Sequence, residues 1–251
     1  MYRKIEGFAV VTGGARGLGA AMAEQLAREG YDVVINYVSD RSTPVAQQLA
    51  DRLKQQYGVG ALPFQGDVSS YDTCRAMFDA GIAAFGDKVA VLINNAGIQS
   101  NKPFQEIEPA AYQRLISIEL LGAMHCTHIA LPYMQKAHNG CIINISSVCA
   151  LYGQALQSDY DAAKAALIGF SRGIANENAK NNIRVNCIAP GLIATDMVAG
   201  LPEEQVEAYR LTIPLQRLGT PEDISECMSY IVNATYLTGQ VISPNGGVAM
   251  Y

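Results

Sequence analysis

Charge is scarce in this sequence, and its balance leans to the negative side. Only 16% of the 251 residues are Asp, Glu, Lys or Arg, and the formal net charge at pH 7 is −5. A surface that binds nucleic acid needs clustered Lys and Arg, so we expect no nucleic-acid partner. The hydrophobic share of 49% instead suits one large core with strands buried on both faces of a sheet.

Long apolar runs and paired cysteines are also missing. The chain reaches a glycine loop directly after one short apolar run, Phe8–Val11, which leaves no room for the apolar region of a signal peptide. No other run is long enough to read as a membrane span. The six cysteines contain no CxxC pair and stand at positions 74, 126, 141, 149, 187 and 227. They indicate buried thiols of a reduced compartment, so we expect a cytoplasmic protein with no membrane partner.

Histidine is rare, and its placement argues against two kinds of site. His125 and His128 share a predicted helix face, but no Cys or carboxylate cluster completes a metal site, so we expect no metal. Residues 169–173 match the GxSxG pattern of serine hydrolases, which requires a strand before the serine and a histidine after it. Ser171 falls inside a predicted helix and all three histidines precede it, so we reject the hydrolase interpretation.

Short apolar runs alternate with longer helical patterns along the whole chain. The runs predict strands at Phe8–Val11, Val33–Tyr37, Ala61–Phe64, Val89–Ile93, Cys141–Ile145, Val185–Ala189 and Gln240–Ser243. The longer patterns predict helices at Leu18–Glu29, Pro44–Tyr57, Tyr71–Phe85, Ala110–Lys136, Tyr160–Lys180 and Pro221–Val232. Without a linker or repeat, this alternation predicts one α/β domain over residues 1–251. It is a doubly wound, Rossmann-like parallel sheet of about seven strands with helices on both faces.

A glycine-rich loop, Thr12–Gly19, follows the first predicted strand and opens a helix. Glycines let the backbone turn tightly and approach a pyrophosphate, and a helix N-terminus offers free N–H groups and a partial positive charge. A glycine-rich turn without a ligand is the simpler interpretation of the pattern taken alone. Its place between a strand and a helix, at the start of a repeated β/α chain, favours a dinucleotide-binding loop.

The TGxxxGxG spacing of this loop is the form found in the short-chain dehydrogenase/reductase family, which the chain resembles over nearly its whole length. Further matches follow in order at Asp67-Val68, Asn94 to Gly97, Ser147, Tyr160 to Lys164, and Pro190-Gly191 with Thr195. Each stands at the carboxyl end of a predicted strand or in the helix after it, where such sheets bind ligands. The resemblance implies an oxidoreductase with a nicotinamide cofactor.

The resemblance also implies which residues contact the cofactor. Asp67 and Val68 would flank the adenine, Asn94 to Gly97 would lie along the ribose and nicotinamide, and Ile193 and Thr195 would touch the nicotinamide end. The full predicted set is Gly13, Gly14, Arg16, Gly17, Leu18, Gly19, Asn36, Asp67, Val68, Asn94, Ala96, Gly97, Tyr160, Lys164, Pro190, Gly191, Ile193 and Thr195.

Tyr160 and Lys164 stand four residues apart in a predicted helix and therefore share one face. The pKa of a free tyrosine, about 10, is high for a proton donor near neutrality. An ammonium fixed about 4 Å away stabilises the phenolate by about 4 kcal/mol, enough to lower that pKa by about two to three. Ser147 can hydrogen-bond the substrate oxygen, and the family spacing favours it over Ser146. We predict the catalytic group Ser147, Tyr160 and Lys164.

One position departs from the family pattern. Glu119, in the preceding helix, stands where the family usually has an asparagine that helps to hold a water between the lysine and solvent. The sequence leaves several alternatives open. Glu119 pairs with Lys164, holds the water itself, marks a site of altered activity, or is a neutral variation.

The residues after the second predicted strand favour NADP(H) over NAD(H). NAD enzymes usually place an acid at the end of this strand to bind the ribose 2′-hydroxyl, and here the position is Asn36. Arg16 and Arg41 are nearby cations, and the guanidinium fork suits a 2′-phosphate. Asp40 is the one neighbour that argues for NAD(H).

The sequence leaves the substrate open. Within the family the strongest likeness is to 3-oxoacyl-(acyl-carrier-protein) reductases, so we expect an NADPH-dependent carbonyl reductase. The alternatives are a dehydrogenase of a steroid, sugar or other small alcohol, and a catalytically weak cofactor-binding regulatory protein, which Glu119 favours. An acyl carrier protein is acidic and needs a basic docking patch, for which Lys136, Arg172 and Lys180 are sparse candidates.

Two further features concern the surface. Residues 197–218 follow Thr195 and combine a polar stretch with flanking apolar residues, so we expect an amphipathic lid over the substrate, with an ordinary surface helix as the alternative. The predicted helices Ala110–Lys136 and Tyr160–Lys180 carry more apolar residues than one sheet face can cover. We therefore expect a homo-oligomer, and the family resemblance implies a tetramer.

Overall fold

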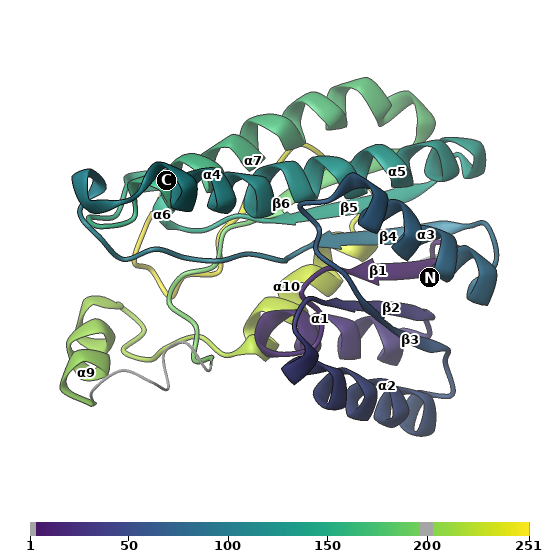
Figure 1. The fold of residues 1–251 in the computed structure, drawn as a ribbon, viewed down its shortest axis with the longest axis horizontal. Helices are drawn as coiled ribbons and strands as arrows, with labels where there is room; N and C mark the ends of the chain where they lie inside the picture. Colours follow the sequence, from purple (N-terminus) through teal and green to yellow (C-terminus); the bar gives the residue numbers. More distant parts are fainter. Residues whose placement is uncertain (1–3, 196–202, 251) are drawn as a thin grey trace.

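A computed structural model describes residues 4–195 and 203–250 of the chain (Figure 1). Its centre is a seven-stranded sheet with the order β3-β2-β1-β4-β5-β6-β7, in which every neighbouring pair is parallel. The strands are β1 Phe8–Val11, β2 Val33–Tyr37, β3 Ala61–Gln65, β4 Val89–Asn94, β5 Gly140–Ile145, β6 Ile183–Ile188 and β7 Val241–Ile242. The order reverses between β1 and β4, which is where open α/β sheets bind ligands at their carboxyl ends.

Helices cover both faces of the sheet (Figure 1). The helices α1 (Gly17–Arg28), α2 (Thr43–Tyr57) and α10 (Pro221–Asn233) pack on one face through fully buried side chains such as Met22 and Met228. The other face carries α3, α5 and α7, with Phe78 and Ile129 among the buried side chains. Their bounds, with those of the shorter helices, are α3 Tyr71–Phe85, α4 Pro109–Ile116, α5 Gly122–Ala137, α6 Cys149–Tyr152, α7 Ser158–Asn178 and α9 Glu203–Thr212.

The predicted fold class is confirmed, and its strands are found in the predicted order. β1, β4, β5 and β6 are buried along their whole length, which explains why they are apolar runs rather than alternating patterns. The helix ends follow local sequence signals. Thr220 and Asp223 form a capping box at the start of α10, and Gly58 ends α2 with a φ of +68°.

The predicted helix Ala110–Lys136 is one continuous helical stretch but not a regular α-helix. A single π-helical turn, Ser117–Leu121, separates α4 from α5. Within the described part of the chain, the stretch Pro109–Ala137 is long and apolar enough, by length and composition alone, to cross a membrane. Its second half packs against the sheet through Cys126, Ile129 and Met134, as expected of a core helix.

The helix α9 stands apart from the sheet, at the lower left of Figure 1. It belongs to the predicted lid 197–218, of which Met197, Gly200 and Leu201 lie outside the described residues. Tyr209 and Leu211 on α9 are exposed, whereas Ile213 directly after the helix is buried. The segment returns to the body at Leu215, whose N–H donates to Gly246 O (3.0 Å), and at Gly219, whose O accepts from Ala194 N (2.8 Å). The lid function stays a prediction.

Candidate active site

The glycine loop connects the carboxyl end of β1 to the start of α1. Gly13 and Gly17 have φ values of +60° and +54°, in the left-handed region that glycine enters without strain. A Cβ on Gly19 would lie 2.2 Å from the carbonyl oxygen of Gly13, so only glycine allows this close approach. Arg16, the N-cap residue of α1, makes no side-chain capping bond, and Leu18 packs on the core. The uncapped helix start and the glycine cradle fit a pyrophosphate.

The loop after β4 is tied to the glycine loop by residues that the sequence analysis did not single out. Thr12 Oγ1 accepts hydrogen bonds from the backbone N–H groups of Asn95 (2.9 Å) and Ala96 (3.0 Å). Asn95 Nδ2 donates to the carbonyl oxygens of Thr12 (3.0 Å) and Gly13 (3.1 Å). Asn94 points into the core instead, where its Nδ2 donates to Asn144 Oδ1 (2.7 Å). Its side chain therefore joins β4 to β5.

Asn36 lies at the end of β2 and is 3% exposed. Its Oδ1 accepts a hydrogen bond from Gly13 N (3.3 Å), and its Nδ2 donates to Gly66 O (2.9 Å). The backbone carbonyl of Asn36 accepts from Gly14 N (2.7 Å). The side chain predicted to stand near the ribose thus also holds the glycine loop against β3.

Arg16 and Asp40, the two charged groups near the end of β2, have different hydrogen-bond partners. Arg16 is exposed, and its Nη2 donates to Ser42 Oγ (2.7 Å), so the glycine-loop cation reaches the segment that enters α2. Asp40 Oδ1 accepts from Gln65 Nε2 (2.6 Å) at the end of β3. The carboxylate that argued for NAD(H) is therefore engaged by an amide rather than by Arg16.

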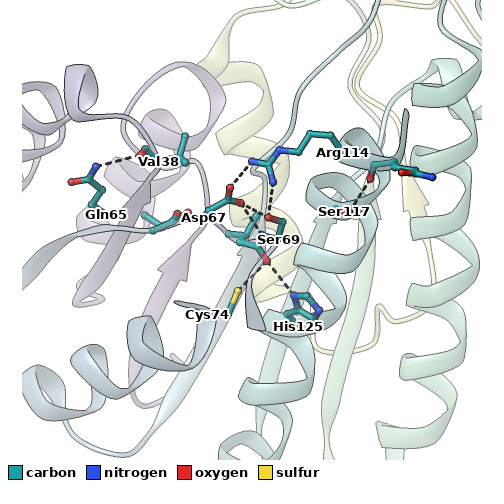
Figure 2. A network of polar contacts seen from close by, with 12 residues as sticks. Val38, Gln65, Asp67, Ser69, Cys74, Arg114, Ser117 and His125 are labelled. Atoms are coloured by element: carbon teal, nitrogen blue, oxygen red, sulfur yellow. Dashed lines mark hydrogen bonds and ion pairs between the residues drawn. The ribbon is translucent and has the colours of Figure 1, made fainter. Parts of the chain in front are cut away.

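Figure 2 shows the polar network after β3, where the sequence predicted the adenine contacts. The carboxylate of Asp67 forms an ion pair with Arg114 and accepts from Ser69 N (2.9 Å) and Ser69 Oγ (2.7 Å). Burial raises the pKa of Asp67, but the bonds from Arg114 and Ser69 outweigh it, so the pKa lies below its usual value. The carbonyl of Val68 lies 3.2 Å from Nδ1 of His125. Arg114 thus positions Asp67, although 47 residues separate the two in sequence.

The loop after β6 contacts both β5 and the glycine loop. Val148 N donates to Pro190 O (2.9 Å), and Gly191 N donates to Pro244 O (3.0 Å). Ile193 is buried and pairs with Gly219 in an isolated parallel bridge. The Cγ2 atom of Thr195 would lie 3.7 Å from a Cβ on Gly17. The predicted nicotinamide-end residues therefore meet the predicted pyrophosphate loop.

Ser147, Tyr160 and Lys164 come together as predicted. Ser147 follows β5 directly, while Tyr160 and Lys164 lie on one face of α7, with Lys164 Nζ 5.4 Å from the centroid of the tyrosine ring. The Ser147 hydroxyl lies near enough to the Tyr160 side chain to lower the pKa of its phenol. Ser146 Oγ instead donates to Lys164 O (2.8 Å), on the helix backbone. Of the two serines, Ser147 is the one that contacts the tyrosine.

Glu119 pairs directly with Lys164. Lys164 Nζ lies 2.6 Å from Glu119 Oε2, and the two side chains are only 5% and 1% exposed. Glu119 Oε1 accepts a hydrogen bond from Ile98 N (2.9 Å), and Lys164 Nζ also donates to Ile145 O (2.7 Å). Among the alternatives that the sequence left open, the structure shows the direct ion pair.

The charges of this group act against one another at Tyr160. Burial raises the pKa of Tyr160, the ammonium of Lys164 lowers it, the carboxylate of Glu119 raises it and the bond from Ser147 lowers it. The net direction is upward, so the expectation of a strongly lowered tyrosine pKa is wrong for the protein without cofactor. Burial lowers the pKa of Lys164, but Glu119 and Tyr160 together raise it by more. The net pKa lies above the ordinary value, so Lys164 stays an ammonium.

Two alternative sites receive no support from the described residues. Ser171 of the GxSxG match is 1% exposed, donates to Leu167 O (2.7 Å) and accepts from Asn144 Nδ2 (2.7 Å), so it is a packing residue of α7. Within residues 4–195 and 203–250, no three His, Cys, Asp or Glu side chains stand close enough to hold a metal ion.

A parallel doubly wound sheet, with a glycine loop and a Ser-Tyr-Lys group at the carboxyl ends of its strands, defines a Rossmann-like oxidoreductase. The family model for short chain dehydrogenases matches residues 7–206. The chain belongs to the short-chain dehydrogenase family.

Curated relatives cover almost the whole chain. It is 36% identical over 244 residues to the 3-oxoacyl-[acyl-carrier-protein] reductase FabG of Staphylococcus aureus, covering 96% of this chain and 98% of that protein. It is 37% identical over 252 residues to the protein of the same name from Aquifex aeolicus, covering 99% and 100%. It is also 39% identical over 245 residues to the cis-4-hydroxycyclohexanecarboxylate dehydrogenase of Sinomonas cyclohexanicum, covering 96% of each.

Proposed function

We propose that this protein is an NADPH-dependent carbonyl reductase. The observation that carries the proposal is the contact of Ser147 and Lys164 with Tyr160 at the sheet edge where the glycine loop opens. The Tyr160 phenol can donate its proton to a ketone oxygen, and the nearby ammonium of Lys164 stabilises the phenolate that this leaves. The nicotinamide, when bound, supplies the hydride.

Each residue of the group has a distinct task in this proposal. Ser147 donates a hydrogen bond to the carbonyl oxygen and holds it toward Tyr160. Tyr160 gives its proton to that oxygen as negative charge develops on it. Lys164 stays charged beside Tyr160 and stabilises the phenolate that the proton transfer leaves behind.

NADP(H) is the proposed cofactor because of the charges near the end of β2. Arg16 is exposed and held by Ser42, so it presents a guanidinium to the side where the 2′-phosphate would lie. Oδ1 of Asp40 accepts a hydrogen bond from Gln65 Nε2 on β3, and this bond holds the carboxylate toward β3. The other residues predicted from the sequence would line the cofactor site, whereas the side chain of Asn94 joins β4 to β5.

The substrate is proposed as a ketone, with 3-oxoacyl thioesters as the first class to test. Two relatives are named as 3-oxoacyl-acyl-carrier-protein reductases and a third as a dehydrogenase of a cyclic hydroxy acid. Lys136, a candidate for docking an acidic carrier protein, is already paired with Asp87 at 2.7 Å. Because this pairing partly neutralises the Lys136 charge, a small free ketone is the second class to test.

Three further properties complete the proposal. Residues 197–218, including α9, form a lid whose exposed Tyr209 and Leu211 close over the substrate. The exposed Leu121 and Met124 near the start of α5 belong to the contact surface of a homotetramer. The enzyme is cytoplasmic, in keeping with six free cysteines.

The test follows the absorbance of NADPH with a panel of a 3-oxoacyl thioester, cyclic keto acids, steroids and sugars. Tyr160→Phe should lower turnover at least about 100-fold, because the ring without its hydroxyl has no proton to donate. NADPH binding, measured by calorimetry, should stay unchanged. A variant that keeps more than a few per cent of the activity would exclude Tyr160 as the proton donor. No turnover of any ketone by the wild type would favour the regulatory alternative.

A further inference from the structure

Three parts of the fold hold the ion pair of Glu119 and Lys164 in place: the π-helical turn, the loop after β4 and the end of β5. Glu119 lies in the π-helical turn Ser117–Leu121, and such turns are frequent at functional sites. A Cβ on Gly97 would lie 2.4 Å from Glu119 Oε1, so the carboxylate rests directly on the backbone of the loop after β4. Ile98 N donates to the same oxygen, and Ile145 O accepts from the lysine it pairs with.

The pair changes what the tyrosine experiences. An isolated ammonium beside a phenol favours the phenolate, whereas a carboxylate 2.6 Å from that ammonium cancels much of its field. Four groups from four elements influence the charge of Tyr160. They are Lys164 on α7, Glu119 on the π-helical turn, Ser147 after β5 and Cys149 on α6. Lys164 itself also faces Cys187 of β6. Among these groups, Glu119 is the one carboxylate.

We infer that Glu119 is a positioning residue that holds Lys164 in place and offsets its charge at Tyr160, so that the phenol stays protonated, and ketone reduction continues, to higher pH than beside an uncompensated lysine. This inference rests on the proposed function. Reduction starts from the protonated phenol and oxidation starts from the phenolate, so a group that disfavours the phenolate moves the pH limits of both directions upward. Glu119 acts through Lys164 and contacts neither substrate nor phenol in this role.

The expected effect of Glu119 on the titration of Tyr160 follows from the distance between them. Oε2 of Glu119 is at most about 8 Å from the centroid of the Tyr160 ring, since Nζ of Lys164 lies 2.6 Å from the one and 5.4 Å from the other. One unit charge at that separation moves a titration by about 1.5 pH units at an effective dielectric near 20. Glu119→Gln removes the charge and keeps one oxygen that can accept from Ile98 N, while an amide NH2 replaces the oxygen that faces Lys164.

The first experiment titrates Tyr160 in the protein without cofactor or substrate, by the ultraviolet absorption of tyrosinate. The sequence contains no tryptophan to obscure the signal, and subtracting the same titration in Tyr160→Phe isolates this residue among the 13 tyrosines. Tyr160 should titrate at least about one pH unit lower in Glu119→Gln than in wild type. Glu119→Asp keeps the carboxylate, so Tyr160 should titrate close to its wild-type pH in this variant. Glu226→Gln removes an exposed charge on α10 and should leave the titration of Tyr160 unchanged.

The second experiment measures the pH dependence of kcat for both directions. In Glu119→Gln, kcat for alcohol oxidation should rise at a lower pH than in wild type, by the same amount as the titration of Tyr160 moves. The decline of kcat for ketone reduction at high pH should also begin at a lower pH. A Tyr160 titration that stays at the wild-type pH in folded Glu119→Gln overturns the inference. If that variant does not fold, Glu119→Asn carries the same test. Failure of the proposed function is distinct, because turnover would then survive in Tyr160→Phe while the titration remained measurable.

Discussion

The buried ion pair makes a quantitative prediction about stability through Lys164→Met. Methionine keeps most of the aliphatic side chain but removes the ammonium, so the Glu119 carboxylate is left buried without a cation. Breaking one partner of such a pair costs about 3–5 kcal/mol of unfolding free energy. Each kcal/mol lowers Tm by about 2–4 °C in a chain of this length, so we expect Tm to fall by about 6–20 °C. Urea unfolding followed by circular dichroism measures the free energy, and calorimetry measures Tm.

A double variant separates the charge effect from loss of packing. Adding Glu119→Gln to Lys164→Met leaves no uncompensated charge, so at least half of the lost stability should return. The reasoning is refuted if the two substitutions add within about 0.5 kcal/mol. That result would mean that the pair contributes by packing alone.

Three further predictions concern the cofactor, the lid and the assembly. Arg16→Ala should weaken NADPH binding about 10- to 100-fold by calorimetry and leave NADH binding nearly unchanged, because one charge-assisted contact is lost; equal affinities of wild type for both cofactors would contradict the proposed phosphate contact. Tyr209→Ala should change the ratio of kcat/KM between a thioester and a small ketone while stability changes by less than about 0.5 kcal/mol. A loss of stability with an unchanged ratio would argue against the lid. Light scattering at micromolar concentration should give about four times the 26.9 kDa chain mass, whereas a stable monomer would exclude the oligomer.

Much of the fold was predictable because strands and helices carry local signals. The strand runs at Phe8–Val11 and Val33–Tyr37 coincide with β1 and β2, since a strand buried on both faces must be apolar throughout. The limit of this reasoning appears at Ser117–Leu121. The helical pattern continues through this stretch unbroken, and the π turn within it has no local signal that we recognised.

The candidate site was predictable where chemistry depends on spacing within one element. Tyr160 and Lys164 share a face because four residues make about one helical turn, whatever the rest of the fold does. Two other contacts depend on which loops become neighbours in the fold. They are the hydrogen bond from Asn95 to the glycine loop and the ion pair of Arg114 with Asp67. Their sequence separations of 82 and 47 residues carry no such information.

Glu119 shows most clearly what each level decided. The sequence by itself determined that a carboxylate stands one helix before the Tyr160-Lys164 motif, and that alternation of strands and helices brings strand ends to one edge. Only the tertiary structure decided that this carboxylate turns inward, rests on Gly97 and pairs with Lys164 at 2.6 Å. The physical reason is that charge interactions depend on distance and burial, which arise when separate elements pack, whereas hydrophobic periodicity acts within a single element.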